Sequence, residues 1–226
     1  MTFDEIIRCL STEEQKIIKE MMVLYDEIDR QTSNFSGQTG LSCKAGCGAC
    51  CENPEIETTV AEVLPLAAYL WSQGLASNKL EAIRLNSSKG VCVFYEPMNM
   101  KGTVPLNSLN CRGQSPSTGQ GRCGIYAYRP GLCRLFGFAA RRDKHGQPVL
   151  VTCRVIKDSQ AQACQRTQEQ LQKGLEAPLL ASHAFAVSNI DPVHCLKLFP
   201  INQAIRLALE KIGFNLQKQN LTLPLK

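Results

Sequence analysis

The chain has 226 residues, of which 44% are hydrophobic and 20% charged, as expected for a globular protein that buries a core. Its net charge of +5 is mild and its basic residues are dispersed apart from Arg141-Arg142, which argues against a nucleic-acid partner. No run reaches the roughly 18–20 apolar residues that span a membrane, and acids follow Met1 where a secretory signal carries bases. We therefore expect a cytoplasmic protein that binds neither membrane nor nucleic acid.

The N-terminal residues 3–30 predict a helical segment. Thr2 with Glu5, and Ser11 with Glu14, match the capping-box pattern. Apolar side chains then recur at helical spacing; they are Ile17, Met21, Leu24, Tyr25 and Ile28. The polar, glycine-bearing residues 31–42 predict a connector.

Two helices and a strand are expected before residue 97. Thr58 or Thr59 caps a helix that runs to about Gln73 and closes at Gly74, with a kink or break at Pro65. Ser77 caps a second helix through about Asn86, and residues 90–95 predict a short strand. Residues 97–121 show no periodicity and predict a surface insertion that contains Cys111.

The C-terminal half begins with a predicted β-hairpin over residues 135–155, which turns near Lys144-His145-Gly146 and carries Cys153 on its returning strand. Helices are expected over 159–173, 176–188 and 201–212, the last opened by Pro200, with a loose tail after Gly213. The chain as a whole predicts a single domain, 1–226, with an α+β, mainly α-helical fold. Its parts are a helical segment (3–30), a cysteine-cluster region (40–155) with a short β-hairpin, and C-terminal helices (156–226).

Twelve cysteines in a reducing compartment are more readily ligands than disulfides; in an exported protein the disulfide interpretation would return. Four lie within nine residues: Cys43, Cys47, Cys50 and Cys51. The glycines between them tolerate the positive φ of a tight loop, so the loop can direct several thiolates at a soft metal ion or an iron–sulfur cluster. Adjacent side chains of extended backbone point to opposite sides. The adjacent Cys50 and Cys51 are therefore awkward ligands for a single ion; they could serve different metal atoms, or one could be a core or redox thiol.

Four further thiols complete a predicted set of eight metal ligands: Cys92, Cys123, Cys133 and Cys153. Eight thiols permit two S4 sites or one site with reserve thiols, and one or two can instead be buried apolar thiols. S4 coordination suits zinc or iron–sulfur, and the irregular spacing without C-x2-C pairs favours iron–sulfur. The spacing C-x3-C-x2-C also occurs in radical S-adenosylmethionine enzymes, but those require βα units that this chain does not predict.

The second constellation, together with C-x3-C-x2-C-C at 43–51, resembles the CxxCxxCC family of YkgJ-like cysteine-cluster proteins, described as zinc- or iron-chelating. It reads Cys123-Gly124-Ile125-Tyr126-Ala127-Tyr128-Arg129-Pro130-Gly131-Leu132-Cys133-Arg134. The resemblance covers roughly residues 40–155 and implies a bound metal centre, with no established activity for most members. A related region in flagellin lysine N-methylase makes protein methylation an analogy, although no glycine-rich nucleotide loop is present here. Cys111 departs from the usual spacing, so either it or Cys92 fills the mid-chain ligand role.

Three other residues of this motif are candidate cofactor-binding residues: Tyr126, Arg129 and Arg134. The ring of Tyr126 could pack over the metal site, and the arginines could offset thiolate charge or bind a carboxylate or phosphate. Alternatively, each arginine forms a structural salt bridge; the partners considered are Glu52, Glu55, Glu57 and Glu62. Cys9, Cys164 and Cys195 show no cluster spacing, and a solvated or core role is expected for His183.

We predict a metal-binding protein that holds an iron–sulfur cluster, preferred over zinc, and serves a redox, maturation or client-binding role with a protein partner. The alternative is a metal-dependent protein-modifying enzyme, such as a lysine N-methylase-like S-adenosylmethionine-dependent transferase.

Overall fold

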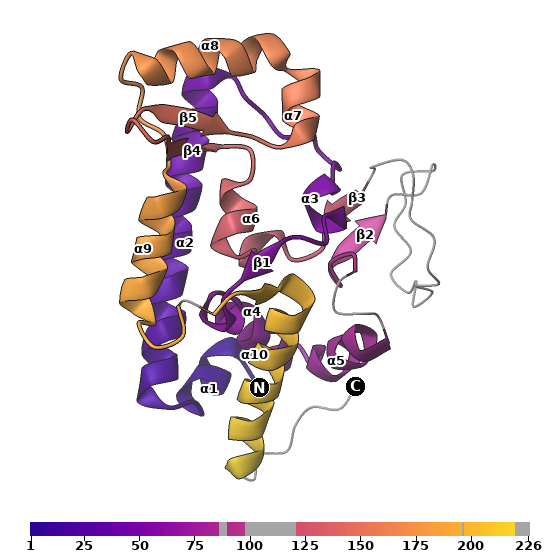
Figure 1. Ribbon diagram of the computed structural model, residues 1–226. Coiled ribbons are helices and arrows are strands. Elements are labelled where there is room, and N and C mark those ends of the chain that lie inside the picture. Colours follow the sequence, from indigo (N-terminus) through magenta and orange to yellow (C-terminus); the bar gives the residue numbers. More distant parts are fainter. Residues whose placement is uncertain (86–89, 98–120, 196, 220–226) are drawn as a thin grey trace.

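The computed structural model describes residues 1–85, 90–97, 121–195 and 197–219, and most of them are helical (Figure 1). The helices are α1 (Phe3–Arg8), α2 (Thr12–Thr39), α3 (Ala49–Glu52), α4 (Val60–Ser72), α5 (Ala76–Leu85), the 3-10 turn η1 (Tyr126–Tyr128), α6 (Gly131–Leu135), α7 (Arg154–Ser159), α8 (Ala161–Gln172), α9 (Leu180–Ile190) and α10 (Ile201–Lys218). The strands are β1 (Glu57–Thr58), β2 (Tyr95–Pro97), β3 (Gly121–Cys123), β4 (Ala139–Arg142), β5 (Pro148–Val151) and β6 (Phe199–Pro200). They form antiparallel pairs, β1 with β6, β2 with β3 and β4 with β5. The mainly α-helical α+β class is therefore confirmed.

The N-terminal segment forms two helices, and the second is longer than predicted. Both predicted capping boxes are present, at Thr2 and at Ser11. α2 runs through most of the predicted connector and ends at Gly40, whose φ is +73°. The connector prediction is wrong because Thr32 and Phe35 extend the buried stripe of α2, and packing outweighs the low helix propensity of this polar stretch.

The main core lies where α4 packs against α2 and α10. In Figure 1, α1, α4, α5 and α10 gather at one end of α2, whereas the β4–β5 hairpin, α7 and α8 lie at the other. Thr59 caps α4 as predicted. Pro65 does not break α4, because the side chains on either side of it, Leu64 and Leu66, are each only 1% exposed, and their burial offsets the lost backbone hydrogen bond.

The predicted strand at 90–95 is wrong except at its last residue. Residues 90–94 form a bend and a turn, in which the Tyr95 amide donates to the Cys92 carbonyl at 2.9 Å. β2 begins at Tyr95 and pairs with β3, so that Tyr95 lies opposite Cys123. The turn therefore brings Cys92 close to the strand that carries Cys123. The predicted insertion with Cys111 lies almost wholly outside the described residues.

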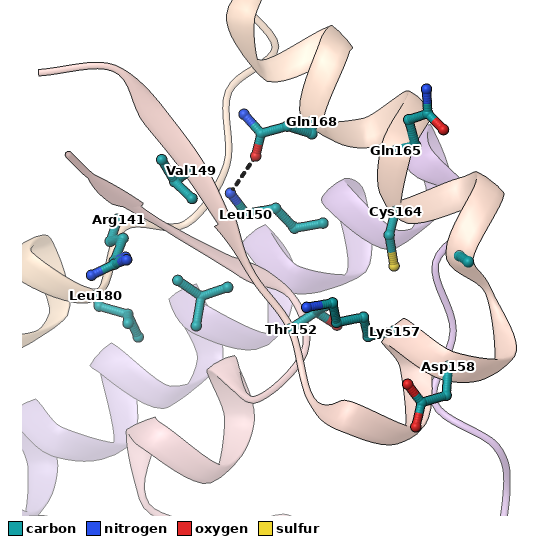
Figure 2. A pocket seen from close by; sticks show the side chains of 12 residues that line it. Arg141, Val149, Leu150, Thr152, Lys157, Asp158, Cys164, Gln165, Gln168 and Leu180 are labelled. Carbon is teal, nitrogen blue, oxygen red and sulfur yellow. Dashed lines mark hydrogen bonds between the residues drawn. The ribbon is translucent and has the colours of Figure 1, made fainter. Parts of the chain in front are cut away.

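The predicted hairpin is confirmed as β4 and β5, with Ala139 paired to Val151 and Gly146 at φ +77° in the turn. The side chain of Gln168 in α8 protects the edge of β5: its Oε1 accepts from the Leu150 amide at 2.8 Å, and its Nε2 donates to the Pro148 carbonyl at 3.0 Å (Figure 2). Exposed strand edges invite pairing with other chains, and Gln168 occupies this one. Among the described helices, none is both long enough and apolar enough to cross a membrane.

The last helix does not end where the sequence suggested. α10 continues past Gly213 to Lys218, because Gly213 lies against the Trp71 ring of α4, whose Nε1 donates to the Leu209 carbonyl at 3.0 Å. A Cβ at position 213 would stand 2.6 Å from Trp71 Cζ2. Gly213 is therefore a packing residue and not a helix terminator.

We expect Gly213→Ala to lower the free energy of unfolding by about 1–3 kcal/mol, because the added methyl overpacks the α4–α10 contact. Urea denaturation of the variant and the wild type measures the difference. Gly37→Ala is the matched control, since a Cβ at position 37 meets nothing within 4 Å. An unchanged unfolding midpoint in Gly213→Ala would contradict this account of the helix–helix contact.

Candidate metal centre

The first cysteine cluster forms a tight loop that is fixed at both ends. Ser42 and Gln160 exchange hydrogen bonds, with the Ser42 amide donating at 3.1 Å and Gln160 Nε2 donating to the Ser42 carbonyl at 2.6 Å. Gly48 has φ +56°, and a Cβ there would lie 2.5 Å from the Tyr95 ring and 2.8 Å from the Gly121 backbone. The loop therefore needs glycine at position 48 both for its φ and for the close approach of β2 and β3.

Five thiols from separate segments converge next to this loop. We call them the inner thiol group: Cys50, Cys51, Cys92, Cys123 and Cys133. The Cys51 thiol lies in hydrogen-bond contact with those of Cys50, Cys92 and Cys123. Cys133 is close enough for its charge to interact with those of Cys50, Cys92 and Cys123. Sulfur atoms up to 83 residues apart in the chain thus meet, and all the described cysteines are free thiols.

Backbone contacts and one buried amide hold these segments together. The Cys92 amide donates to the Cys51 carbonyl at 2.8 Å, and the Gly124 amide to the Phe94 carbonyl at 2.8 Å. Asn202 of α10, only 2% exposed, accepts from the Val93 amide at 2.9 Å and donates to the Val91 carbonyl at 3.0 Å. Its side chain therefore fixes the backbone on both sides of Cys92, a role that no feature of the sequence indicated.

The adjacent pair Cys50–Cys51 lies in helical backbone, α3, and not in extended backbone. The two thiols therefore do not point to opposite sides, and they contact one another. The argument that they must serve separate metal atoms loses its premise.

The inner thiol group contains thiols with very different acidities. Hydrogen bonding by Cys51 is the main cause that lowers the pKa of Cys50 to about 6 and that of Cys123 to about 7. The positive charge of Arg129 lowers the pKa of both further. Burial raises the pKa of Cys133 well above its ordinary value. Since the thiolate is the metal-binding form, Cys50 and Cys123 are prepared for coordination near neutral pH.

Arg129 and Tyr126 lie together at the edge of the inner thiol group. The Arg129 guanidinium stacks on the Tyr126 ring, 3.4 Å from its centroid. Its Nη1 donates to the Cys133 carbonyl at 3.3 Å and its Nε to the Tyr126 carbonyl at 3.1 Å. Tyr126 is 65% exposed, so the stacked pair joins the protein surface to the thiols.

Arg134 is a structural residue by its contacts. It is buried, forms an ion pair with Asp29 of α2, and donates to the carbonyls of Arg129 and Ala127. The alternative of a structural salt bridge is thus realised, but none of the four glutamates considered is the partner. The contacts leave Arg134 facing no open site, contrary to its prediction as a cofactor-binding residue.

A buried carboxylate that the sequence interpretation used only as a possible salt-bridge partner supports the second motif. Glu62 accepts from Thr58 Oγ1 at 2.9 Å, from the Thr59 amide at 3.2 Å and from the Gly131 amide at 3.1 Å, and it lies 3.1 Å from His183 Nε2. The predicted core role of His183 is consistent with this contact. The spacing Thr59-x-x-Glu62 is a capping box, the signal by which Glu62 could have been found.

The remaining thiols of the motifs form a second set, which we call the outer thiol group: Cys43, Cys47, Cys153 and Cys164. Cys43 is hydrogen-bonded to Cys47, and its charge interacts with that of Cys153; the charge of Cys153 in turn interacts with that of Cys164. Each spatial group therefore mixes cysteines from both halves of the motif region.

The thiols converge without forming a closed coordination shell. In the described part of the chain, no three Cys, His, Asp or Glu side chains stand ready to hold a metal ion. Four sulfurs bound to zinc at about 2.3 Å lie about 3.8 Å from each other, whereas Cys51 contacts three thiols as the centre of a star. Coordination at the inner thiol group therefore requires side-chain rotation. An all-thiol donor set suits zinc or an iron–sulfur cluster.

The fold and this donor set define a cysteine-rich metal-binding domain carried on a helical frame. The family model CxxCxxCC, described as "Putative zinc- or iron-chelating domain", matches residues 42–165, more than half of the chain. The chain belongs to this family, and zinc or iron chelation is the property that the family describes. No curated protein and no solved structure matches significantly.

We expect Arg129→Gln to move zinc loading to higher pH. Ligand thiols must lose their protons to bind metal, and Arg129 lowers the pKa of Cys50 and Cys123. Wild-type affinity should weaken as the pH falls below about 7, and the variant should weaken at a higher pH. Competition with a chromophoric chelator across the pH range measures both profiles. Arg141→Gln, on the hairpin, is the control, and coincident profiles for Arg129→Gln and wild type would be inconsistent with this role.

Proposed function

We propose that the inner thiol group holds an iron–sulfur cluster of the 4Fe-4S type, with zinc as the second candidate. The observation that carries the proposal is the convergence of five thiols from four segments around Cys51. A tetrahedral zinc ion takes four ligands, so five thiols exceed its need. A cluster of several iron atoms spreads its cysteine ligands over a larger volume, which suits a set that does not close around a single point.

The chain's own residues would serve such a centre in separate ways. Cys50 and Cys123 provide the thiolates that form most readily, and Arg129 offsets part of their negative charge. Asn202 fixes the segment of Cys92, and Glu62 fixes the start of α6, the helix of Cys133. The bound cluster would supply one-electron transfer, at a potential set by these charges, hydrogen bonds and burial.

We propose a redox, maturation or client-binding role in preference to an enzymatic one. A methylase-like enzyme would need a cofactor pocket beside Tyr126 and Arg129. The cavity of about 1000 Å³ found in the structure is instead lined by the hairpin, α7, α8 and Leu180 (Figure 2). The exposed Tyr126 on Arg129 offers a protein partner a contact point that lies next to the thiols, which supports electron or metal transfer to a partner.

Anaerobic purification followed by a visible absorption spectrum and analysis of iron, acid-labile sulfide and zinc tests the assignment. A broad visible band with matching iron and sulfide supports the iron–sulfur cluster. A colourless protein with stoichiometric zinc replaces it by zinc. A reduced chain that binds neither metal on reconstitution would overturn metal binding by the inner thiol group.

A further inference from the structure

We infer that the outer thiol group, Cys43, Cys47, Cys153 and Cys164, forms a second metal centre that takes a single zinc-like divalent ion. This inference rests on the proposed function, since it assumes that the chain binds metal through thiolates. It adds a ligand, Cys164, that showed no cluster spacing in the sequence, and it separates four cysteines from the centre around Cys51.

The first argument is that the two halves of this group are tied together. The hydrogen bonds between Ser42 and Gln160, at 3.1 Å and 2.6 Å, place the residue next to Cys43 at the junction of α7 and α8. Figure 1 shows the segment between α2 and α3 passing beside α7. Cys153 precedes α7 directly, and Cys164 lies in the first turn of α8. The chain thus brings Cys43 to the place where the other two cysteines start their helices.

The second argument is that Cys153 and Cys164 face the same residue. The sulfur of Cys153 accepts from the Ile156 amide at 3.4 Å, and the sulfur of Cys164 lies 3.9 Å from the Ile156 carbonyl. The two sulfurs therefore lie on either side of one turn of α7. Cys47 joins Cys43 through the turn in which the Cys47 amide donates to the Lys44 carbonyl at 3.1 Å, and the two thiols are hydrogen-bonded.

The surroundings are also polar where an apolar thiol would need none. Figure 2 shows the Cys164 sulfur pointing from α8 toward the side where Thr152 and Lys157 lie. The Thr152 hydroxyl is buried and has no hydrogen-bond partner in the described structure, although buried hydroxyls nearly always have one. A metal-bound sulfur of the neighbouring Cys153 would give it an acceptor. The cavity beside Cys164 gives an ion access from solvent.

The chemistry of this group fits zinc better than a cluster. Four thiols are the number that a tetrahedral zinc ion takes. When four thiols bind one divalent ion, they release four protons to solvent and leave a centre with two negative charges. The charge of Lys157 already interacts with Cys164 and would offset part of that charge. The sulfurs do not yet form a closed shell, so the loop that carries Cys43 and Cys47 must close on the ion.

Titration of the reduced, metal-free full-length chain with Co²⁺ under anaerobic conditions tests this inference. Absorption by thiolate-to-cobalt charge transfer gives the number of ions bound. Cys153→Ser/Cys164→Ser should bind one equivalent fewer than the wild type. Cys9→Ser/Cys195→Ser, which removes two thiols outside both groups, should bind the wild-type number. Equal binding by Cys153→Ser/Cys164→Ser and wild type would overturn the second centre.

Two further measurements make the result decisive. Far-ultraviolet circular dichroism checks that Cys153→Ser/Cys164→Ser is folded; if it is not, Cys43→Ser, which changes an exposed residue, replaces it and should also lose one equivalent. Failure of the proposed function looks different, because a wild-type chain that binds no cobalt removes both centres together. Loss of cobalt only by Cys51→Ser/Cys123→Ser, with none lost by the outer variants, would leave the inner centre alone.

Discussion

Replacement of both Cys51 and Cys123 by serine should reduce the iron and sulfide content of the anaerobically purified protein to below about a tenth of the wild-type value. Outer contacts of metal ligands already change affinity by roughly 10–100-fold, so the loss of the central thiol and its partner has at least that effect. Cys51 contacts three other thiols of the inner thiol group, and serine offers a poor ligand for soft metals in its place.

The matched control for this prediction is Cys9→Ser/Cys195→Ser, which removes two thiols that show no cluster spacing. Its iron and sulfide content should equal that of the wild type. If Cys51→Ser/Cys123→Ser retained the full iron and sulfide content, the convergence around Cys51 would not be the cluster site, whatever the remaining thiols do.

Glu62→Gln should lower the free energy of unfolding of the metal-free chain by about 3–5 kcal/mol, the usual effect of breaking a buried charged pair. Glu62 is 5% exposed, and both of its oxygens accept hydrogen bonds, on one side from Thr58 and Thr59 and on the other from Gly131. The amide of glutamine must present its NH₂ group to one of these sets of donors and leave it unsatisfied.

The pH dependence of Glu62→Gln separates lost charge from general disruption. Burial alone would raise the pKa of Glu62, but hydrogen bonds and charge from His183, with the bonds from Thr59 and Thr58, lower it below 4.5. A carboxyl whose pKa is lowered on folding stabilises the protein above its unfolded pKa, and this stabilisation is lost as the pH falls through the folded pKa. The difference between variant and wild type should therefore be largest near neutral pH and shrink below 4.5.

Urea denaturation at a series of pH values measures this difference. Glu57→Gln, an exposed carboxylate in β1, is the control and should leave stability nearly unchanged. A stability difference for Glu62→Gln that stays constant as the pH falls would argue against an ionised Glu62 as the stabilising group.

The elements that the sequence predicted well depend on neighbours along the chain. The capping boxes at Thr2, Ser11 and Thr59 and the hairpin turn at Gly146 are set within a few residues, where local chemistry decides. The wrong predictions concern residues held by distant contacts. Residues 31–39 are helical because Phe35 is buried, and α10 passes Gly213 because that glycine lies on Trp71.

The candidate site divides in the same way. The thiols and the loop glycines could be recognised because their spacing is local, but their grouping could not. Which sulfurs meet depends on Asn202 beside Cys92 and on Gln160 beside Cys43, contacts of 109 and 118 residues in sequence separation. The partner of Arg134 was missed for the same reason, since Asp29 lies 105 residues away.

The buried supports of the thiol segments come from outside the part of the chain that the family model matches. Asp29 holds Arg134, His183 reaches Glu62, and Asn202 anchors Val91 and Val93, yet all three supports lie beyond residues 42–165. A fragment trimmed to those limits would leave a guanidinium, a carboxylate and two peptide groups without partners. The metal-binding part is consequently not a transplantable module, and a graft onto another protein would have to bring its own helical cradle.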